Sequence, residues 1–133
     1  MTDAALGRVV DQFSLPLSSG DYKRVISMLS PDVVLEDLAL RTRIDGQRAV
    51  EIYFRRAATL LLYGTGSTVN HVVGNAKGGA YEWNSEPDLA GLNGMTAIEL
   101  DGDHIITRLT CIRNTFSVGN DTMEMLAKLS IES

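Results

Sequence analysis

The spacing of apolar residues changes near Gly64, and this change constrains the fold more than any other feature of the chain. Before Gly64, apolar residues recur at helical spacing, as Leu6, Val10 and Phe13 do in the first segment. Beyond it, apolar and polar residues alternate as in half-buried strands. These predicted strands lie at 67–76, 80–86, 94–100 and 104–112. Helices followed by an antiparallel meander predict an α+β domain.

The first half of the chain carries clear start and stop signals. Asp21 and Asp45 are good N-caps, and Ser30-Pro31-Asp32 ends a helical pattern. The helices are expected at about 3–17, 22–29 and 46–61, with a strand at 33–37 and a short extended piece at 42–44. Near the C-terminus, Asp121-Thr122-Met123-Glu124 resembles a capping box, which predicts a short helix at 121–129.

Length, charge and cysteine count narrow the class of protein. The 133 residues fit one domain, 1–133, with a sizeable core. A net charge of −5 argues against nucleic acid or an anionic membrane as a partner. The one cysteine, Cys111, cannot form an internal disulfide, and the N-terminus has no signal-peptide pattern. No apolar run is long enough to cross a bilayer. We therefore expect a soluble, cytoplasmic protein.

The segment Val33-Val34-Leu35-Glu36-Asp37-Leu38-Ala39-Leu40 holds the best candidate for chemistry. Side chains alternate faces along a strand, so Glu36 and Asp37 lie on opposite faces. Val33 and Leu35 share the face of Asp37. Burying a carboxylate among apolar side chains costs free energy, unless a cation or hydrogen-bond donors pair with it. A buried carboxylate is therefore expected to have such a partner or a functional role. Asp37 is therefore a candidate general base, and the alternative is an acid in a cap or salt bridge.

The order of these motifs resembles the nuclear-transport-factor-2-like superfamily, which includes ketosteroid isomerase and SnoaL-like polyketide cyclases. The resemblance covers roughly residues 5–114. It rests on Ser19-Gly20-Asp21, Ser30-Pro31-Asp32-Val33-Val34, Glu36-Asp37, Asp45-Gly46, Tyr53-Phe54, Leu92-Asn93-Gly94 and Asp101-Gly102-Asp103-His104-Ile105. It implies a cone-shaped α+β fold, with N-terminal helices on a curved, mainly antiparallel sheet, and a homodimer.

Against ketosteroid isomerase, the resemblance places the catalytic aspartate on Asp37. The tyrosine that donates to the substrate oxygen falls on Phe13, and the second donor, a protonated aspartate, falls near Thr96. That enzyme is the standard example of an aspartate base beside a protonated aspartic acid. The resemblance therefore implies that this chain keeps the catalytic base and lacks both hydrogen-bond donors. Without these donors, the negative charge of a dienolate intermediate is not stabilised.

Two further residues could complete a site. His71 lies mid-strand with Val69 and Val73 expected on its face, where a neutral imidazole near Asp37 could act as the acid. A core histidine is the alternative. Arg108 could bind an anionic substrate group or lie solvated on its strand.

A hydrophobic pocket is predicted from apolar and aromatic side chains. Its expected lining, besides Arg108, is Phe13, Leu35, Tyr53, Phe54, Trp83 and Met95. Tyr81 and Trp83 share one strand face, whereas Glu82 and Asn84 share the other. The sequence leaves open which of these two faces lines the pocket.

The leading hypothesis is a cofactor-free isomerase, cyclase or dehydratase that acts on a small, mainly apolar carbonyl compound. Asp37 would be the base, and His71 or a tyrosine the acid. The sequence carries no metal signature and no phosphate-binding loop. Under this hypothesis, Asp37→Asn should abolish turnover and leave the melting temperature nearly unchanged or higher. The alternative is a non-catalytic ligand-binding or dimerisation module of the same fold.

Overall fold

The computed structural model describes residues 4–61, 68–84 and 93–113. The helices are α1 (Ala4–Ser19), α2 (Tyr22–Ser27) and α3 (Gln47–Leu61). The strands are β1 (Leu29–Asp37), β2 (Thr42–Asp45), β3 (Thr68–Asn75), β4 (Gly78–Asn84), β5 (Asn93–Leu100) and β6 (Ile106–Arg113). The predicted C-terminal helix at 121–129 lies outside the described residues.

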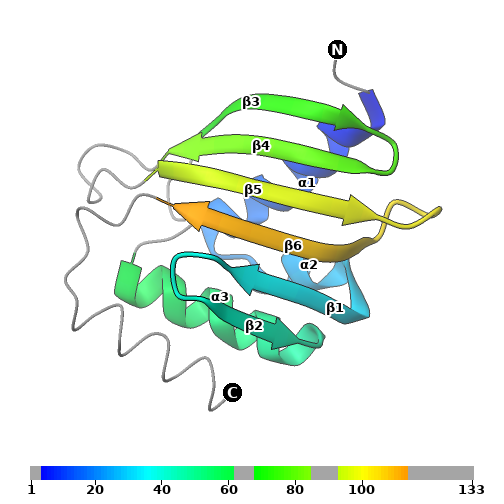
Figure 1. Cartoon of the computed structure of the whole chain (residues 1–133). Coiled ribbons are helices and arrows are strands. Elements are labelled where there is room, and N and C mark those ends of the chain that lie inside the picture. The colour runs from blue at the N-terminus through cyan, green and yellow to red at the C-terminus, as the bar shows by residue number, and fades with distance from the viewer. Residues whose placement is uncertain (1–3, 62–67, 85–92, 114–133) are drawn as a thin grey trace.

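The strands form one sheet, and the described helices all cover the same face of it. The strand order is β2-β1-β6-β5-β4-β3, and Figure 1 shows α1, α2 and α3 behind the curved sheet. Every neighbouring pair is antiparallel except β1 and β6, which run parallel. The predicted α+β class, with helices on a curved, mainly antiparallel sheet, is confirmed. We call the helix-covered side the inner face and the other side the outer face.

The main departures from the predicted elements lie around two prolines. α1 continues through Pro16 to Ser19, whose hydroxyl donates to the Pro16 carbonyl. β1 begins at Leu29, earlier than expected, and its pairing with β6 shifts register between Leu29 and Val34. Pro31 lies within that shift, where its missing N–H costs no ladder hydrogen bond. The strand therefore starts directly after α2.

Side chains on the inner face form the core with the buried faces of the helices. The fully buried residues come from every layer, and the largest are Tyr53, Phe13, Phe54, Leu6, Leu35, Ile106 and Leu109. The rings of Phe13 and Phe54 meet edge to face, 6.0 Å apart between centroids. Phe54 and Tyr53 meet in the same way at 5.5 Å. This aromatic cluster joins α1 to α3 and places the Tyr53 side chain over β1.

Close approach of α1 to the β3–β4 hairpin requires a glycine at position 74. Gly74 has φ +144°, and a Cβ there would lie 2.4 Å from the Gly78 carbonyl oxygen and 2.6 Å from a Leu6 methyl carbon. We expect Gly74→Ala to lower the free energy of unfolding by about 1–3 kcal/mol. Gly7→Ala is the control, because nothing lies within 4 Å of its Cβ.

In Gly7→Ala the helix propensity of alanine should raise stability by up to about 1 kcal/mol. Chemical denaturation of both variants measures the two opposite shifts. Equal effects in the two variants would contradict the close packing of α1 on the hairpin.

Candidate functional site

Asp37 lies at the end of β1 and is buried with three hydrogen-bond donors around its carboxylate. Its exposed fraction is 0%. The Leu40 backbone N–H donates to Oδ1 at 3.1 Å, and the Tyr53 hydroxyl donates to Oδ2. Arg113 Nη1 also donates to Oδ2, at 2.5 Å. Asp37 is thus fixed by its own loop, by α3 and by β6.

Arg113 supplies the charge that lets this carboxylate stay inside the protein. Both side chains of the Arg113–Asp37 ion pair are 0% exposed. Arginine stays protonated under all ordinary conditions, so the guanidinium is a permanent partner for the buried anion. Arg113 Nη1 also lies 3.4 Å from the Tyr53 hydroxyl oxygen. We call Asp37, Tyr53 and Arg113 the buried triad.

The two oxygens of the Asp37 carboxylate accept unequal numbers of hydrogen bonds from the described residues. A carboxylate offers about four acceptor positions, two on each oxygen. Tyr53 and Arg113 take both positions on Oδ2, whereas Leu40 takes one on Oδ1. One acceptor position therefore remains on Oδ1, which is what a general base requires.

Tyr53 is held as a neutral phenol. Burial raises its pKa well above the ordinary value, and the neighbouring Asp37 carboxylate raises it further. Burial also raises the pKa of Tyr81 above its ordinary value. Both phenols therefore keep their protons in the folded protein, and Tyr53 donates its proton in a hydrogen bond to Asp37.

These raised pKa values predict that stability falls at alkaline pH. Unfolded tyrosines ionise near about pH 10, whereas Tyr53 and Tyr81 keep their protons when folded, so unfolding releases protons. Above about pH 10, the free energy of unfolding should fall by about 1.4 kcal/mol per pH unit for each of the two tyrosines. Urea denaturation across that pH range measures the slope of the free energy of unfolding against pH. Tyr81→Phe should reduce this slope by about 1.4 kcal/mol per pH unit, which is the contribution of one tyrosine. An unchanged slope in Tyr81→Phe would contradict the shift.

Asp37 begins a polar row that crosses the inner face of the sheet. It pairs in register with Cys111 on β6, Cys111 with Thr96 on β5, and Thr96 with Tyr81 on β4. All four residues are buried. Trp83 Nε1 donates to Thr96 Oγ1 at 3.1 Å. Adjacent strands lie about 4.8 Å apart, so the row spans about 14 Å from Asp37 to Tyr81.

The structure brings most of the predicted pocket residues to the inner face. Phe13, Leu35, Tyr53, Phe54 and Trp83 are all buried there. Tyr81 and Trp83 point inward, whereas Glu82 is exposed on the outer face. Phe13 is packed on Phe54, and the Thr96 hydroxyl accepts a hydrogen bond from Trp83 Nε1.

His71 does not lie beside Asp37. A β-bulge between Val69 and His71 adds one residue to β3, so His71 pairs with Glu82 on the outer face. Val69 pairs with Trp83, so it does not share a face with His71 as simple alternation suggested. His71 is exposed on an edge strand, and β4, β5 and β6 separate β3 from β1. The acid nearest to Asp37 is the Tyr53 phenol.

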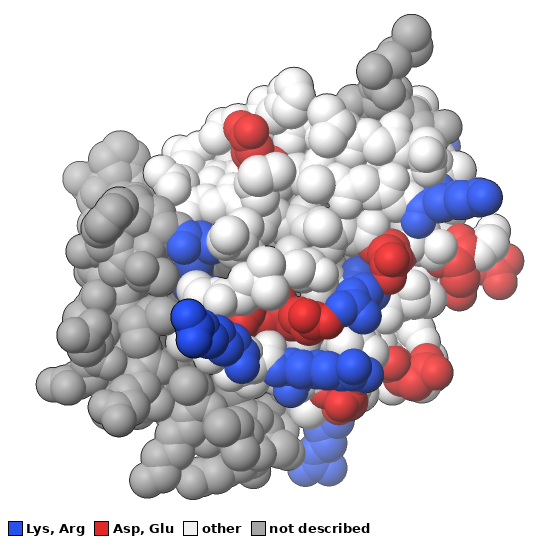
Figure 2. Space-filling model, in the orientation of Figure 1, with Lys and Arg blue, Asp and Glu red and all other residues white. Residues whose placement is uncertain are grey.

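Met95 and Arg108 also lie on the outer face, so neither faces the buried Asp37. Met95 instead lines a pocket of about 530 Å³ together with Trp83. Met95 is exposed beside Ile112, its partner on β6. Arg108 pairs with Glu36, the acid on the other side of β1 from Asp37. Figure 2 shows acidic and basic side chains gathered over the part of this face formed by β1, β2 and β6. Strand alternation places both residues outside because Thr96, Leu109 and Cys111 point inward.

Arg113 is the functional candidate that sequence reasoning missed. Alternation from Leu109 and Cys111 places it on the inner face, so the inward direction could have been predicted. Its contact with Asp37 depends on the parallel pairing of β1 with β6, which no local pattern indicates.

Within the described ranges, no three His, Cys, Asp or Glu side chains gather as metal ligands would. None of the described helices is long and apolar enough to cross a membrane.

Solved structures show what this fold is similar to. No protein-family model matches the sequence, and no curated protein matches it. A steroid delta-isomerase from Pseudomonas aeruginosa matches with a TM-score of 0.73 and 14% identity, covering 98% of this chain and 94% of that one. A SnoaL-like protein of unknown function from Burkholderia thailandensis matches with a TM-score of 0.73 and 11% identity, covering 86% and 98%.

A third structure, an NTF-2 like protein of unknown function from Burkholderia xenovorans, matches with a TM-score of 0.66 and 12% identity over 82% of each chain. Identities this low carry information about the fold and not about the reaction. Together with the helix-covered curved sheet, these matches show that the chain has the fold of the nuclear-transport-factor-2-like superfamily.

Proposed function

We propose that this protein is a cofactor-free enzyme that transfers a proton on a small, mainly apolar carbonyl compound. The reaction is an isomerisation, an aldol-type cyclisation or a dehydration. The observation that carries the proposal is the environment of Asp37. Its buried carboxylate accepts a hydrogen bond from the neutral phenol of Tyr53, and Oδ1 has one acceptor position without a described donor. A base, a donor and an apolar wall are the parts that proton abstraction next to a carbonyl requires.

Each member of the buried triad has a distinct role in this mechanism. Asp37 Oδ1 takes a proton from the carbon beside the carbonyl group. Tyr53, which keeps its proton, turns its hydroxyl toward the oxygen where negative charge develops. Arg113 offsets the buried charge and holds Asp37 in place. In an isomerisation the same proton returns to a different carbon, so no further reactant is consumed.

Stability alone is a weak explanation for a triad of this kind. A buried ion pair often contributes no more than well-packed apolar residues of similar volume would. Clusters of buried titratable groups occur preferentially at functional sites. The similarity to a steroid delta-isomerase supports an apolar carbonyl compound as the substrate class. Phe13 and Thr96 replace the two donors of ketosteroid isomerase, so the steroid reaction itself is not the one proposed.

Hydrogen exchange at carbon tests the proposal without knowledge of the natural substrate. The protein is incubated in D₂O with a panel of β,γ-unsaturated ketones, cyclic enones and 1,3-diketones. Proton NMR then follows replacement of hydrogen beside the carbonyl. We expect at least one compound to exchange faster with the folded protein than with the denatured protein or with buffer. Compounds that stabilise the protein thermally but do not exchange would overturn the catalytic proposal.

The second candidate function is a non-catalytic ligand-binding or dimerisation module. The specific observation in its favour is that Asp37 and Tyr53 have no exposed surface and that Arg113 already compensates the acid. For such a module, ligand binding without any exchange is the expected result.

Two further expectations accompany either function. A homodimer is supported by the outer face, which no described helix covers and where Val73, Met95 and Ile112 are exposed. Sedimentation equilibrium measures the mass in solution. The cytoplasm is supported as the compartment by the cysteine count, because the one cysteine, Cys111, cannot form an internal disulfide.

A further inference from the structure

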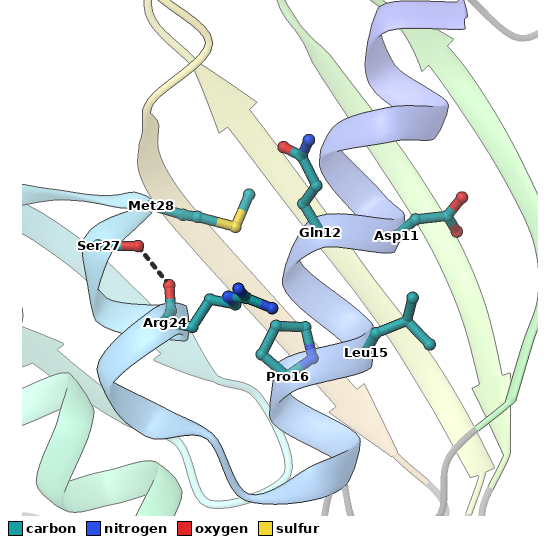
Figure 3. A pocket seen from close by; sticks show the side chains of 7 residues that line it. All are labelled: Asp11, Gln12, Leu15, Pro16, Arg24, Ser27 and Met28. Carbon is teal, nitrogen blue, oxygen red and sulfur yellow. Dashed lines mark hydrogen bonds between the residues drawn. The ribbon is translucent and has the colours of Figure 1, made fainter.

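The Asp37 carboxylate does not reach the surface of the described structure. Its exposed fraction is 0%, and so is that of Tyr53. Three pockets of about 310 to 530 Å³ are lined by described residues, and none of these three is lined by Asp37, Tyr53 or Arg113. The pocket in Figure 3, for example, lies between α1 and α2. A carbonyl compound that reacts with Asp37 therefore needs part of the enclosing structure to move.

Three described elements contact this carboxylate, and the turn between β1 and β2 is the least restrained of them. α3 presents Tyr53, which packs in the aromatic cluster with Phe54. β6 presents Arg113 and has a neighbouring strand on each side, β1 and β5. The turn, Leu38–Arg41, leads into β2, a four-residue strand at the edge of the sheet, as Figure 1 shows. None of the four turn residues is fully buried, and local opening preferentially involves such segments.

The hydrogen bonds of the β1–β2 turn show which part of it covers the carboxylate. Its ends are fixed, because the Leu38 N–H donates to the Cys111 carbonyl at 2.9 Å and Asp37 pairs with Thr42 across the hairpin. Between these ends, the Leu40 N–H donates to Asp37 Oδ1 at 3.1 Å. Thr42 Oγ1 donates to the Leu40 carbonyl at 3.2 Å, and the Leu40 side chain packs half-buried against the core. Leu40 therefore covers Oδ1 from the middle of a turn whose ends are fixed.

Arg41 places backbone strain in the closed turn. Its φ is +53°, in the left-handed region that costs free energy for residues with a Cβ atom. Residues strained in this way occur preferentially at active sites and switch regions. Opening of the turn releases this strain, so the closed and open turns differ less in free energy than they would with glycine at position 41.

We propose, on the basis of the proposed function, that the β1–β2 turn is a gate over Asp37 that opens to admit the carbonyl compound. In the closed state the Leu40 N–H occupies an acceptor position on Oδ1 and its side chain covers the acid. In the open state that position is free and the substrate reaches Oδ1. Because only open molecules bind substrate, activity at low substrate concentration follows the fraction of open molecules.

Amide hydrogen exchange followed by NMR tests whether the turn opens. The Leu40 N–H exchanges when its bond to Asp37 breaks, whereas the Leu109 N–H, on the interior strand β6, reports global unfolding. We expect protection at Leu40 to be at least about tenfold lower than at Leu109. Arg41→Gly removes the strain of the closed turn and should raise protection at Leu40 by about two- to fivefold. Arg41→Ala is the matched control, because it removes the same charge but keeps a Cβ atom, and should change protection by less than about twofold.

Carbon–hydrogen exchange in D₂O, at substrate concentrations below saturation, tests whether this opening admits the substrate. Its rate should fall by about two- to fivefold in Arg41→Gly and by less than about twofold in Arg41→Ala. Equal protection of Leu40 and Leu109, equal effects of the two variants, or full carbon exchange in an Arg41→Gly protein that protects Leu40 more strongly would each overturn the gate. Absence of carbon exchange in every variant, with Leu40 opening as expected, would overturn the proposed function and not the opening of the turn.

Discussion

An Arg113→Met variant should lose about 3–5 kcal/mol of its free energy of unfolding. Methionine fills much of the space of the arginine stem but leaves the Asp37 carboxylate buried without its cation. The remaining donors, Leu40 N–H and the Tyr53 hydroxyl, are neutral and cannot compensate a full charge. Urea denaturation at neutral pH measures the loss.

The same two strands supply a matched control for this prediction. Glu36 and Arg108 pair across β1 and β6 on the outer face, where both side chains are partly exposed. Breaking that pair with Arg108→Met should cost less than about 1 kcal/mol. The double variant Asp37→Leu/Arg113→Met should recover most of the lost stability, because no charge is then stranded. Similar losses for Arg113→Met and Arg108→Met would contradict the interior role of Arg113.

Local patterns predicted the fold class and the inward acid correctly. Alternation along 33–37 placed Asp37 with Val33 and Leu35 on the buried face, and the structure confirms this. Helical spacing likewise placed Phe13 and Tyr53 in the core. These predictions depend only on the spacing of apolar residues within one helix or strand, which can be read directly from the sequence.

The errors arise where one element meets another or where periodicity breaks. The bulge in β3 turned His71 to the outer face, and a single extra residue has no signature in the alternation. The pairing of β1 with β6 joins residues 76 positions apart, Asp37 and Arg113. Sequence reasoning therefore placed Asp37 on the buried face, whereas His71, one of the two kinds of acid that it offered, lies on the outer face.

Arg113 also changes what a substitution of Asp37 should do. The sequence alone predicts that Asp37→Asn leaves the melting temperature nearly unchanged or higher. Arg113 is buried beside Asp37, so in Asp37→Asn its guanidinium keeps a buried positive charge without a carboxylate partner. We therefore expect the free energy of unfolding to fall by about 3–5 kcal/mol. A loss of activity in Asp37→Asn would then have two explanations, unfolding and removal of the base.

The charge-balanced variant Asp37→Asn/Arg113→Gln separates these explanations. It removes both charges and keeps hydrogen-bonding groups beside Tyr53, so it should be more stable than either single variant. If Asp37 is the base, its rate of carbon–hydrogen exchange should still fall by about 10²- to 10⁴-fold relative to the unmodified protein. Exchange measured in D₂O, normalised to the folded fraction from denaturation, gives this ratio.

The matched control removes the other ion pair of the same two strands. Glu36→Gln/Arg108→Gln also deletes one acid and one arginine from β1 and β6, but on the outer face. Its exchange rate should equal that of the unmodified protein. If the charge-balanced variant of the triad keeps full exchange activity while folded, the general base lies elsewhere, and the buried triad is a structural ion pair that joins β1, α3 and β6.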